Sequence, residues 1–388
     1  MGKTVRPTAG KKVKAKNSRR VAAQTAKTAP CEPEKDGSKP FFIVGIGASA
    51  GGYEAIEKFI GNTPSDSGAA YIIVQHLSPD FKSVMDELLA RHTAMKIFRV
   101  EDDMQINPNC IYLIPPNKLM TCYHGKLFLT EKPDKHMLNL PINVFLRSLA
   151  EDQQDQAIAV ILSGTGSDGT LGIRDIKGAA GMVMVQSLET AKFDGMPKSA
   201  IATGMVDYVL PPGEMPRRII DYINHYPAIK PADDKALDNI NVDNLTRILS
   251  IINRETGTDF FHYKPATIIR RVEKRMGLNQ ITEISGYIKL LQNNAQEVRN
   301  LAGELLISVT KFFRDLEAFT FLKEKVIPVI LRAHSDKKPI RVWCTGCSTG
   351  EEAYSVAILF RECMTKMKQH VDVKIFATDI DRQIVEKA

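Results

Sequence analysis

The chain has 388 residues, of which 44% are hydrophobic and 25% are charged, enough for two or three ordinary domains that each bury a core. No window approaches 18 uninterrupted apolar residues and the N-terminus has no apolar signal segment, so the sequence excludes a membrane-spanning helix and predicts a cytoplasmic protein. Six scattered cysteines exclude a disulfide framework, in agreement with a reducing compartment.

The net charge of +7 comes from the first 40 residues. This segment holds 11 Lys or Arg residues against 3 acidic ones, whereas the rest of the chain is nearly neutral. Because it also lacks apolar periodicity, residues 1–40 are predicted to be a disordered basic tail. Loose electrostatic contact of the tail with acidic surfaces is the functional alternative.

Residues 41–225 alternate short β-branched runs with amphipathic stretches, which is typical of a parallel sheet covered by helices. The predicted fold class is therefore α/β, with a doubly wound, mainly parallel sheet. Helices are expected over 52–60 and 81–91, and a hairpin is expected around 123–126. The predicted strands cover 41–45, 70–75, 110–114, 157–162, 181–185 and 207–210.

The composition and the hydrophobic pattern of the sequence change after residue 225. Residues 226–240 combine prolines with charges and have no period, which predicts a linker. Residues 241–335 read as a small all-α domain, because they contain several helical stretches and almost no strand pattern. From 336 a strand-turn-helix pattern resumes, but 336–388 contains only two strands and is expected to be an incomplete domain.

Three reactive side chains follow predicted parallel strands. Ser49 follows FFIVGIG, His76 follows YIIVQ, and Asp168 follows AIAVILSGTG. The carboxyl ends of parallel strands share one edge of a sheet, where sites assemble. A serine becomes nucleophilic when an imidazole accepts its proton and a carboxylate orients that imidazole, so this set suits ester hydrolysis or acyl transfer. Gly51, Gly52 and the loop 163–169 are expected to supply N–H donors for an oxyanion.

Two alternatives compete for this segment. Each of the three residues has a structural explanation when it is taken singly, since a serine at a strand-helix turn is commonly an N-cap. Gly45, Gly47 and Ala50 also fit the G-x-G-x-x-G/A pattern of a dinucleotide site. That site needs an acidic residue at the end of the second strand for the ribose, and Gln75 and His76 stand there instead, which favours nucleophilic chemistry.

The motifs over residues 41–225 resemble the chemotaxis protein-glutamate methylesterase catalytic domain. They are GIGASAGG with Ser49, VQHLSP with His76, ILSGTGSDGTLG with Asp168, and DGMPKSAI. The resemblance implies Ser49 as nucleophile, His76 as general base and Asp168 as orienting acid. It also implies hydrolysis of γ-glutamyl methyl esters on chemoreceptor helices, with glutamine deamidation in many members. The sequence departs from the family by a basic tail in place of a receiver domain, and by Thr165 where methionine is expected.

A second glycine turn opens a helix at GCSTGEEAYS, and the strand after it ends at Asp379. This arrangement suits an adenosine-bearing ligand, because the turn admits the ligand closely and a carboxylate takes the ribose hydroxyls. Cys344 and Cys347 form a C-x-x-C pair, for which a redox pair or half of a zinc site is the alternative. No second pair or histidine cluster follows, so no metal site is expected.

The runs FHYKPATIIRRVEKRM, LLISVTKFFRD and WCTGCSTGEEAYS resemble the chemotaxis receptor methyltransferase over residues 241–388. The resemblance implies S-adenosylmethionine as cofactor, in contact with Thr310, Arg314, Glu351 and Asp379, and a Rossmann-like fold for the incomplete domain. A basic face on one predicted helix is expected either to be solvated or to dock on an acidic receptor helix. Its members are Arg270, Arg271, Lys274 and Arg275.

The whole sequence is therefore interpreted as a receptor methylesterase, which needs no cofactor, fused to part of a receptor methyltransferase. The expected partners are the cytoplasmic helices of methyl-accepting chemoreceptors and other chemosensory signalling proteins, with no specific nucleic acid and no membrane insertion. A methyltransferase with a decayed esterase domain is one alternative. A non-catalytic scaffold that binds receptors through both halves is the other.

Overall fold

The computed structural model describes residues 1–2, 41–76, 85–132, 140–225, 242–306, 310–334, 338–386 and 388. Nearly all of the predicted basic tail and the whole of the predicted linker lie outside these ranges, as does the first part of the helix predicted over 81–91. The chain divides into two units, 1–40 and 41–388, and the description below concerns the second. None of the described helices has the length and apolarity needed to cross a bilayer.

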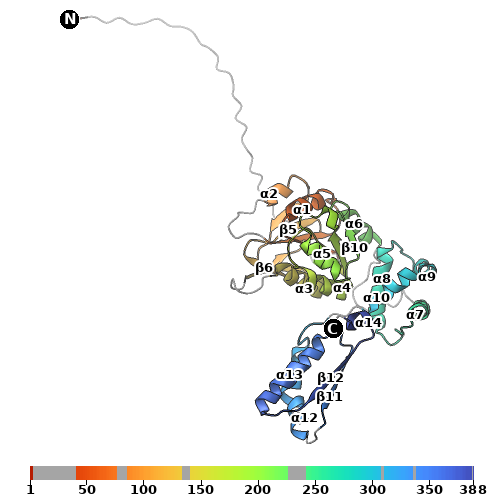
Figure 1. Cartoon of the computed structure of the whole chain (residues 1–388). Coiled ribbons are helices and arrows are strands. Elements are labelled where there is room, and N and C mark those ends of the chain that lie inside the picture. The colour runs from red at the N-terminus through yellow and green to blue at the C-terminus, as the bar shows by residue number, and fades with distance from the viewer. Residues whose placement is uncertain are drawn as a thin grey trace. The chain divides into compact units, whose positions relative to one another are not determined.

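A seven-stranded sheet forms the centre of the first domain (Figure 1). All of its neighbouring strands are parallel, and the inner ones are buried along their length because helices cover both faces. The order across the sheet is β10 (Tyr208–Leu210), β9 (Met182–Gln186), β8 (Ala157–Ile161), β1 (Ile43–Ala48), β2 (Ala70–Gln75), β5 (Cys110–Leu113) and β3 (Lys96–Arg99).

Two layers of helices enclose this sheet and confirm the predicted doubly wound α/β class. On one face, α1 (Gly52–Gly61), α2 (Met85–Leu89) and α6 (Met215–His225) contribute Phe59, Leu89 and Ile219 to one buried cluster. On the other face, α3 (Pro141–Gln153), α4 (Thr170–Gly178) and α5 (Gly195–Ala202) contribute to a second cluster. Two 3-10 turns, η1 (Gln154–Gln156) and η2 (Leu188–Thr190), complete the domain.

The sequence did not predict β3, and it did not predict that the hairpin belongs to a second, separate sheet. The hairpin of β6 (Lys118–Tyr123) and β7 (Lys126–Glu131) is present, and β4 (Met104–Gln105) joins it in a separate antiparallel sheet. His124 and Gly125 both have positive φ, as a tight hairpin turn requires. The Asp152 carboxylate of α3 accepts the Gly125 N–H at 3.0 Å, so the hairpin is attached to the main domain.

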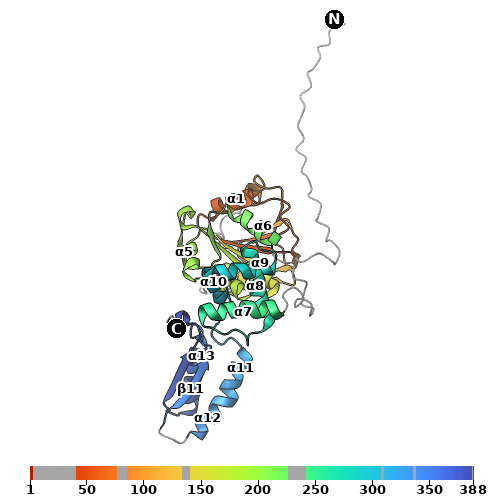
Figure 2. The same ribbon diagram turned by 90° about the vertical axis from the view of Figure 1, so that its right-hand side faces the viewer.

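Four helices follow: α7 (Val242–Thr256), α8 (Pro265–Leu278), α9 (Ile284–Asn293) and α10 (Ala295–Leu305) (Figure 2). Their apolar faces meet in one cluster that includes Ile252, Val272 and Leu301, and no strand occurs within residues 242–306. Of the four residues in the expected basic face on α8, only Arg270 is exposed to solvent. Arg271 and Lys274 are buried, and Arg275 pairs with Glu297.

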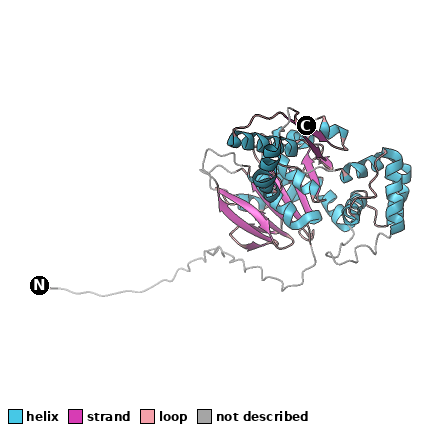
Figure 3. Cartoon of the chain, turned by 90° about the horizontal axis from the view of Figure 1, so that it is seen from below, coloured by secondary structure: helices cyan, strands magenta, loops and turns pink. Residues whose placement is uncertain are grey.

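The last described segment contains two parallel strands, β11 (Ile340–Thr345) and β12 (Val373–Thr378), which are coloured magenta in Figure 3. The helix α13 (Glu351–Met367) connects them, and the short α14 (Arg382–Val385) follows. A continuous helical run consists of α11 (Leu316–Phe321), the π-helical turn η4 (Leu322–Val326) and α12 (Ile327–Ala333). Ile327 and Leu331 of α12 pack against α13. The helix α12 therefore shares a core with the segment after residue 335, although the predicted boundary places it in the helical domain before that residue.

Candidate active site

Ser49 lies one residue beyond the end of β1, in the centre of the sheet. Its N–H donates to the carbonyl of Ser163 at 3.0 Å, which ties the β1 turn to the loop after β8. The next turn residue, Gly51, has φ +68°, and a Cβ there would lie 2.9 Å from Cβ of Lys192. Only glycine meets both demands without strain, and the turn then leads directly into α1.

His76 bridges Ser49 and Asp168. Its Nδ1 atom lies 3.2 Å from Oγ of Ser49, and its Nε2 atom lies 2.8 Å from Oδ2 of Asp168. The imidazole is one third exposed, whereas the Asp168 side chain is only 2% exposed. The structure thus brings together all three residues that the sequence singled out at this edge. With Nε2 donating to the carboxylate, Nδ1 is left as the proton acceptor that faces the serine.

The N-terminus of α3 holds the Asp168 carboxylate. The N–H of Ile142 donates to Oδ2 at 3.0 Å, and the N–H groups of Asn143 and Gly169 donate to Oδ1 at 3.0 and 2.9 Å. Unpaired N–H groups and the helix dipole both stabilise negative charge at such an end. Sequence reasoning missed this contribution. Pro141 at the first helical position was the available signal.

The expected oxyanion donors are only partly free. The N–H of Gly52 donates to the carbonyl of Ser49 at 2.9 Å, and the N–H of Gly164 donates to the carbonyl of Phe193 at 3.0 Å. Gly52 is therefore a wrong choice as a donor. The N–H groups of Gly51 and Thr165 donate to no other described residue, so they remain the candidates beside Ser49.

The glycines that suggested a dinucleotide site have a packing explanation. A Cβ on Gly47 would lie 2.5 Å from Cγ2 of Ile142, and a Cβ on Gly45 would lie 2.9 Å from Cδ2 of Leu146. Both neighbours belong to α3, so the G-x-G pattern lets this helix approach β1 closely. This close approach also brings the N-terminus of α3 to Asp168.

The second glycine turn is held by the acidic residue predicted for it. Asp379 follows β12, and its Oδ2 accepts the N–H of Ser348 at 2.8 Å. Thr345 and Thr378 are paired in the register of β11 and β12, which brings the turn and the carboxylate together. Glu351 begins α13, and its carboxylate accepts the hydroxyl of Thr349 at 2.5 Å.

Thr310 and Arg314, the other two residues predicted for this turn, flank Phe313. The N–H of Phe313 donates to Oγ of Ser355 at 3.0 Å, and Ser355 lies one helical turn after Glu351 on α13. The segment 310–314 therefore reaches the first part of α13.

Cys344 and Cys347 are buried free thiols. Burial raises the pKa of both thiols, and this disfavours the thiolate that redox chemistry or zinc binding requires. Among the residues that the structure describes, no three His, Cys, Asp or Glu side chains cluster as a metal site.

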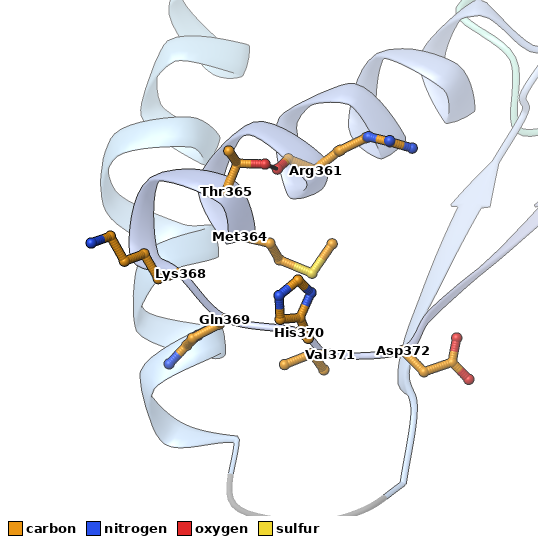
Figure 4. A pocket seen from close by; sticks show the side chains of 8 residues that line it. All are labelled: Arg361, Met364, Thr365, Lys368, Gln369, His370, Val371 and Asp372. Carbon is orange, nitrogen blue, oxygen red and sulfur yellow. Dashed lines mark hydrogen bonds between the residues drawn. The ribbon is translucent and has the colours of Figure 1, made fainter.

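A hollow in the same domain lies at the other end of α13 (Figure 4). Its walls come from the last turns of the helix and the connection to β12, so it does not include the glycine turn or Asp379. The residues that line it are Arg361, Met364, Thr365, Lys368, Gln369, His370, Val371 and Asp372.

A serine, a histidine and a buried aspartate at the carboxyl edge of a doubly wound sheet define an α/β protein with the arrangement of a serine hydrolase. Residues 44–219 match the family model described as CheB methylesterase. Residues 243–306 match the CheR methyltransferase all-alpha domain, and residues 308–388 match the CheR methyltransferase SAM binding domain.

Known relatives agree with these matches. The chain is 33% identical over 166 residues to a putative protein-glutamate methylesterase/protein-glutamine glutaminase of Leptospira interrogans, and it covers 86% of that protein and 42% of its own length. The chain belongs to the CheB protein-glutamate methylesterase family and carries the two CheR methyltransferase domains after the methylesterase domain.

An uncharacterised 104.1 kDa protein of Rhodobacter capsulatus is 39% identical over 324 residues, which are 78% of this chain and 34% of that protein. The chain thus spans about a third to a half of the length of the first relatives it matches. The crystal structure of the Thermotoga maritima CheB methylesterase catalytic domain aligns at 34% identity with a TM-score of 0.44, over 47% of this chain and 98% of that one.

Proposed function

We propose that this chain hydrolyses glutamate γ-methyl esters on chemoreceptors, with Ser49 as nucleophile, His76 as general base and Asp168 as the residue that orients the imidazole. The observation that carries the proposal is the position of His76, which contacts Ser49 through one ring nitrogen and Asp168 through the other. Membership of the methylesterase family supports the choice of an ester of glutamate.

In the proposed reaction, Oγ of Ser49 attacks the ester carbonyl while Nδ1 of His76 takes the hydroxyl proton. The imidazolium is stabilised by Asp168, and the negative oxygen of the tetrahedral intermediate meets N–H donors of the Ser49 turn and the loop after β8. Collapse of the intermediate releases methanol, which takes its proton from His76. Water then attacks the acyl-enzyme with His76 as base, and the products are the receptor glutamate with a free γ-carboxylate and the original serine.

The same steps allow glutamine deamidation, with ammonia in place of methanol as the leaving group. Relatives with this dual name support this second substrate. An amide is intrinsically less reactive than an ester, so we expect deamidation to be the slower reaction.

A second candidate function is S-adenosylmethionine-dependent methylation of receptor glutamates, favoured by the two CheR domains. The turn at 346–350 fits such a ligand, because Gly346 and Gly350 take positive φ and the Asp379 carboxylate lies beside the turn. Thr310, Arg314, Glu351 and Asp379 would hold the cofactor, which supplies the methyl group. We propose the cytoplasm as the site of both reactions, and receptor helices and other chemosensory proteins as partners. A non-catalytic receptor scaffold is the remaining alternative.

Methanol release from a methylated receptor peptide tests the esterase proposal. The wild-type chain should release methanol, and Ser49→Ala should reduce the rate to background. Ser250→Ala is the matched control, because this exposed serine lies on α7 of the helical domain. Equal rates for wild type and Ser49→Ala would contradict the proposal.

A further inference from the structure

The basic face of α8 contacts the methylesterase domain. The Arg271 guanidinium donates to the carbonyls of Lys177 and Gly178, both at 2.6 Å. These carbonyls belong to the last turn of α4, where a helix has unpaired acceptors and favours a cation. Arg271 therefore acts as a C-terminal cap that one domain provides to a helix of the other.

A buried ion cluster lies next to this cap. Lys177 of the methylesterase domain contacts Asp207 and Glu304 at 2.5 Å each, and Lys274 of α8 lies 3.4 Å from the same two carboxylates. Asp207 precedes β10, whereas Glu304 belongs to α10. Each carboxylate thus holds one lysine from its own domain and one from the other domain, and all four side chains are at most 9% exposed.

Arg271 also lies 3.7 Å from Glu304, so three basic side chains face two carboxylates in the cluster. Burial lowers the pKa of Lys274 to about 7 against the pull of Asp207 and Glu304, whereas these carboxylates outweigh burial and raise the pKa of Lys177. The two pKa shifts have opposite directions because Lys177 lies closer to the Asp207 carboxylate than Lys274 does, and because the Lys274 side chain is completely buried. Burial alone would raise the pKa of Asp207. The charges of Lys177 and Lys274 outweigh this effect and lower the pKa to about 2.

Apolar and backbone contacts extend the same interface. The Tyr208 hydroxyl of β10 donates to the carbonyl of Leu278 at 2.9 Å, and the Leu278 side chain packs into the core cluster below α1 and α6. The end of α8 is therefore built into the methylesterase fold. Separation of the two domains would expose this leucine and remove one of the two oppositely charged partners of each lysine and each carboxylate, which is costly.

The helix α4 connects this interface to the candidate active site. Its N-cap, Gly169, donates its N–H to Oδ1 of Asp168, and its last turn carries Lys177. At about 1.5 Å per residue the helix spans roughly 14 Å. A shift of α4 along its axis would move the Asp168 carboxylate relative to His76, because a helix is stiff over this length.

We propose that the helical domain is a built-in docking partner of the methylesterase domain, and that docking positions Asp168 through α4. This inference rests on the proposed esterase function for its effect on turnover. Arg271, Lys274 and Glu304 are positioning residues, since they reach the reacting atoms only through α4. Of the four basic residues of α8 that were expected to meet an acidic partner, Arg271 and Lys274 are committed to this contact.

The test compares two charge reversals in the full chain. Glu304→Lys adds a cation between Lys177 and Lys274, whereas Glu255→Lys makes the same change at a more exposed acid of the helical domain. Glu304→Lys should raise hydrogen exchange over 170–178 and 208–210 and lower kcat by about 10-fold or more with KM nearly unchanged. Glu255→Lys should match wild type in both measurements.

Arg271→Gln is the milder second variant, because it removes the cap on α4 and keeps the carboxylates. The proton resonance of His76 Nε2, assigned by its loss in His76→Gln, reports the contact with Asp168 without turnover. It should shift in Glu304→Lys and Arg271→Gln and stay unchanged in Glu255→Lys. Unchanged exchange in α4, or raised exchange with an unchanged His76 resonance, overturns the proposal. An inactive wild type contradicts only the esterase function.

Discussion

Oδ2 of Asp168 lies 2.8 Å from Nε2 of His76 and 3.0 Å from the backbone nitrogen of Ile142. One carboxylate oxygen therefore serves the imidazole and the N-terminus of α3 at the same time. This shared oxygen holds the carboxylate beside the imidazole, and it makes the N-terminus of α3 part of the site.

Asp168→Asn should keep the fold and lose most of the activity. The asparagine oxygen in place of Oδ1 can still accept the N–H groups of Asn143 and Gly169. The amide nitrogen in place of Oδ2 can accept neither the N–H of Ile142 nor the proton of His76 Nε2, so the wrong imidazole tautomer is favoured. We expect kcat for methanol release to fall by about 10³- to 10⁴-fold. Circular dichroism should be unchanged, and a loss below 10-fold would show that Asp168 does not orient His76.

Gly164→Ala should abolish activity and destabilise the chain. A Cβ at this position would lie 2.2 Å from Sδ of Met196 and 2.8 Å from Cβ of Ser49, so both side chains must shift. Gly303→Ala on α10 is the matched control, because a Cβ there meets nothing within 4 Å and alanine favours the helix by up to about 1 kcal/mol. Methanol release and thermal midpoints check both variants, and an active Gly164→Ala chain would exclude this close packing.

Glu273→Gln should stabilise the chain at alkaline pH. Glu273 is 5% exposed, and burial, together with the Asp155 charge, raises its pKa from 4.5 to about 7 despite Arg270. The folded state holds its proton more tightly than the unfolded state, so stability falls as pH rises from 4.5 through 7, by roughly 3 kcal/mol in total. Urea midpoints at pH 4.5 and 8 should show a gain only at pH 8. The same gain at both values would contradict the assignment.

Asp379→Ala should weaken S-adenosylmethionine binding by the full chain. The carboxylate holds the N–H of Ser348 and is the acidic group nearest the glycine turn in the β12 segment, so its loss removes both the shape of the turn and the ribose acceptor. Calorimetry should give a smaller association constant than for wild type. Asp372→Ala, at the opposite end of β12, should bind like wild type, and equal affinity for all three chains would exclude this site.

Local pattern was sufficient to predict most of the sheet. The strand β2 covers the predicted residues 70–75, because a buried parallel strand is a continuous apolar run. In contrast, β3 is bounded by Lys96 and Arg99 and is only half-buried at Ile97 and Phe98, since it lies at the edge of the sheet. A strand this short and polar gives no distinct signal.

The candidate site was predictable where it depends on strand ends and was not where it depends on distant contacts. Ser49, His76 and Asp168 follow strands that converge at one edge, so their proximity could be inferred from order alone. The role of α3 required knowledge of its close packing on Gly47. The burial of Lys274 was also hidden, because its partner Asp207 is 67 positions away in another domain and no local pattern records such pairing.

The ion cluster around Lys177 and Lys274 has a practical consequence for anyone who expresses one half of this chain alone. Cutting the polypeptide after α6 would turn the most deeply buried charges of each fragment into a hydrated, ionised surface, and would leave the last turn of α4 without its guanidinium cap. Assays on an isolated methylesterase fragment would then describe a domain that lacks its contacts with α8. Its turnover and salt sensitivity should differ from those of the intact protein.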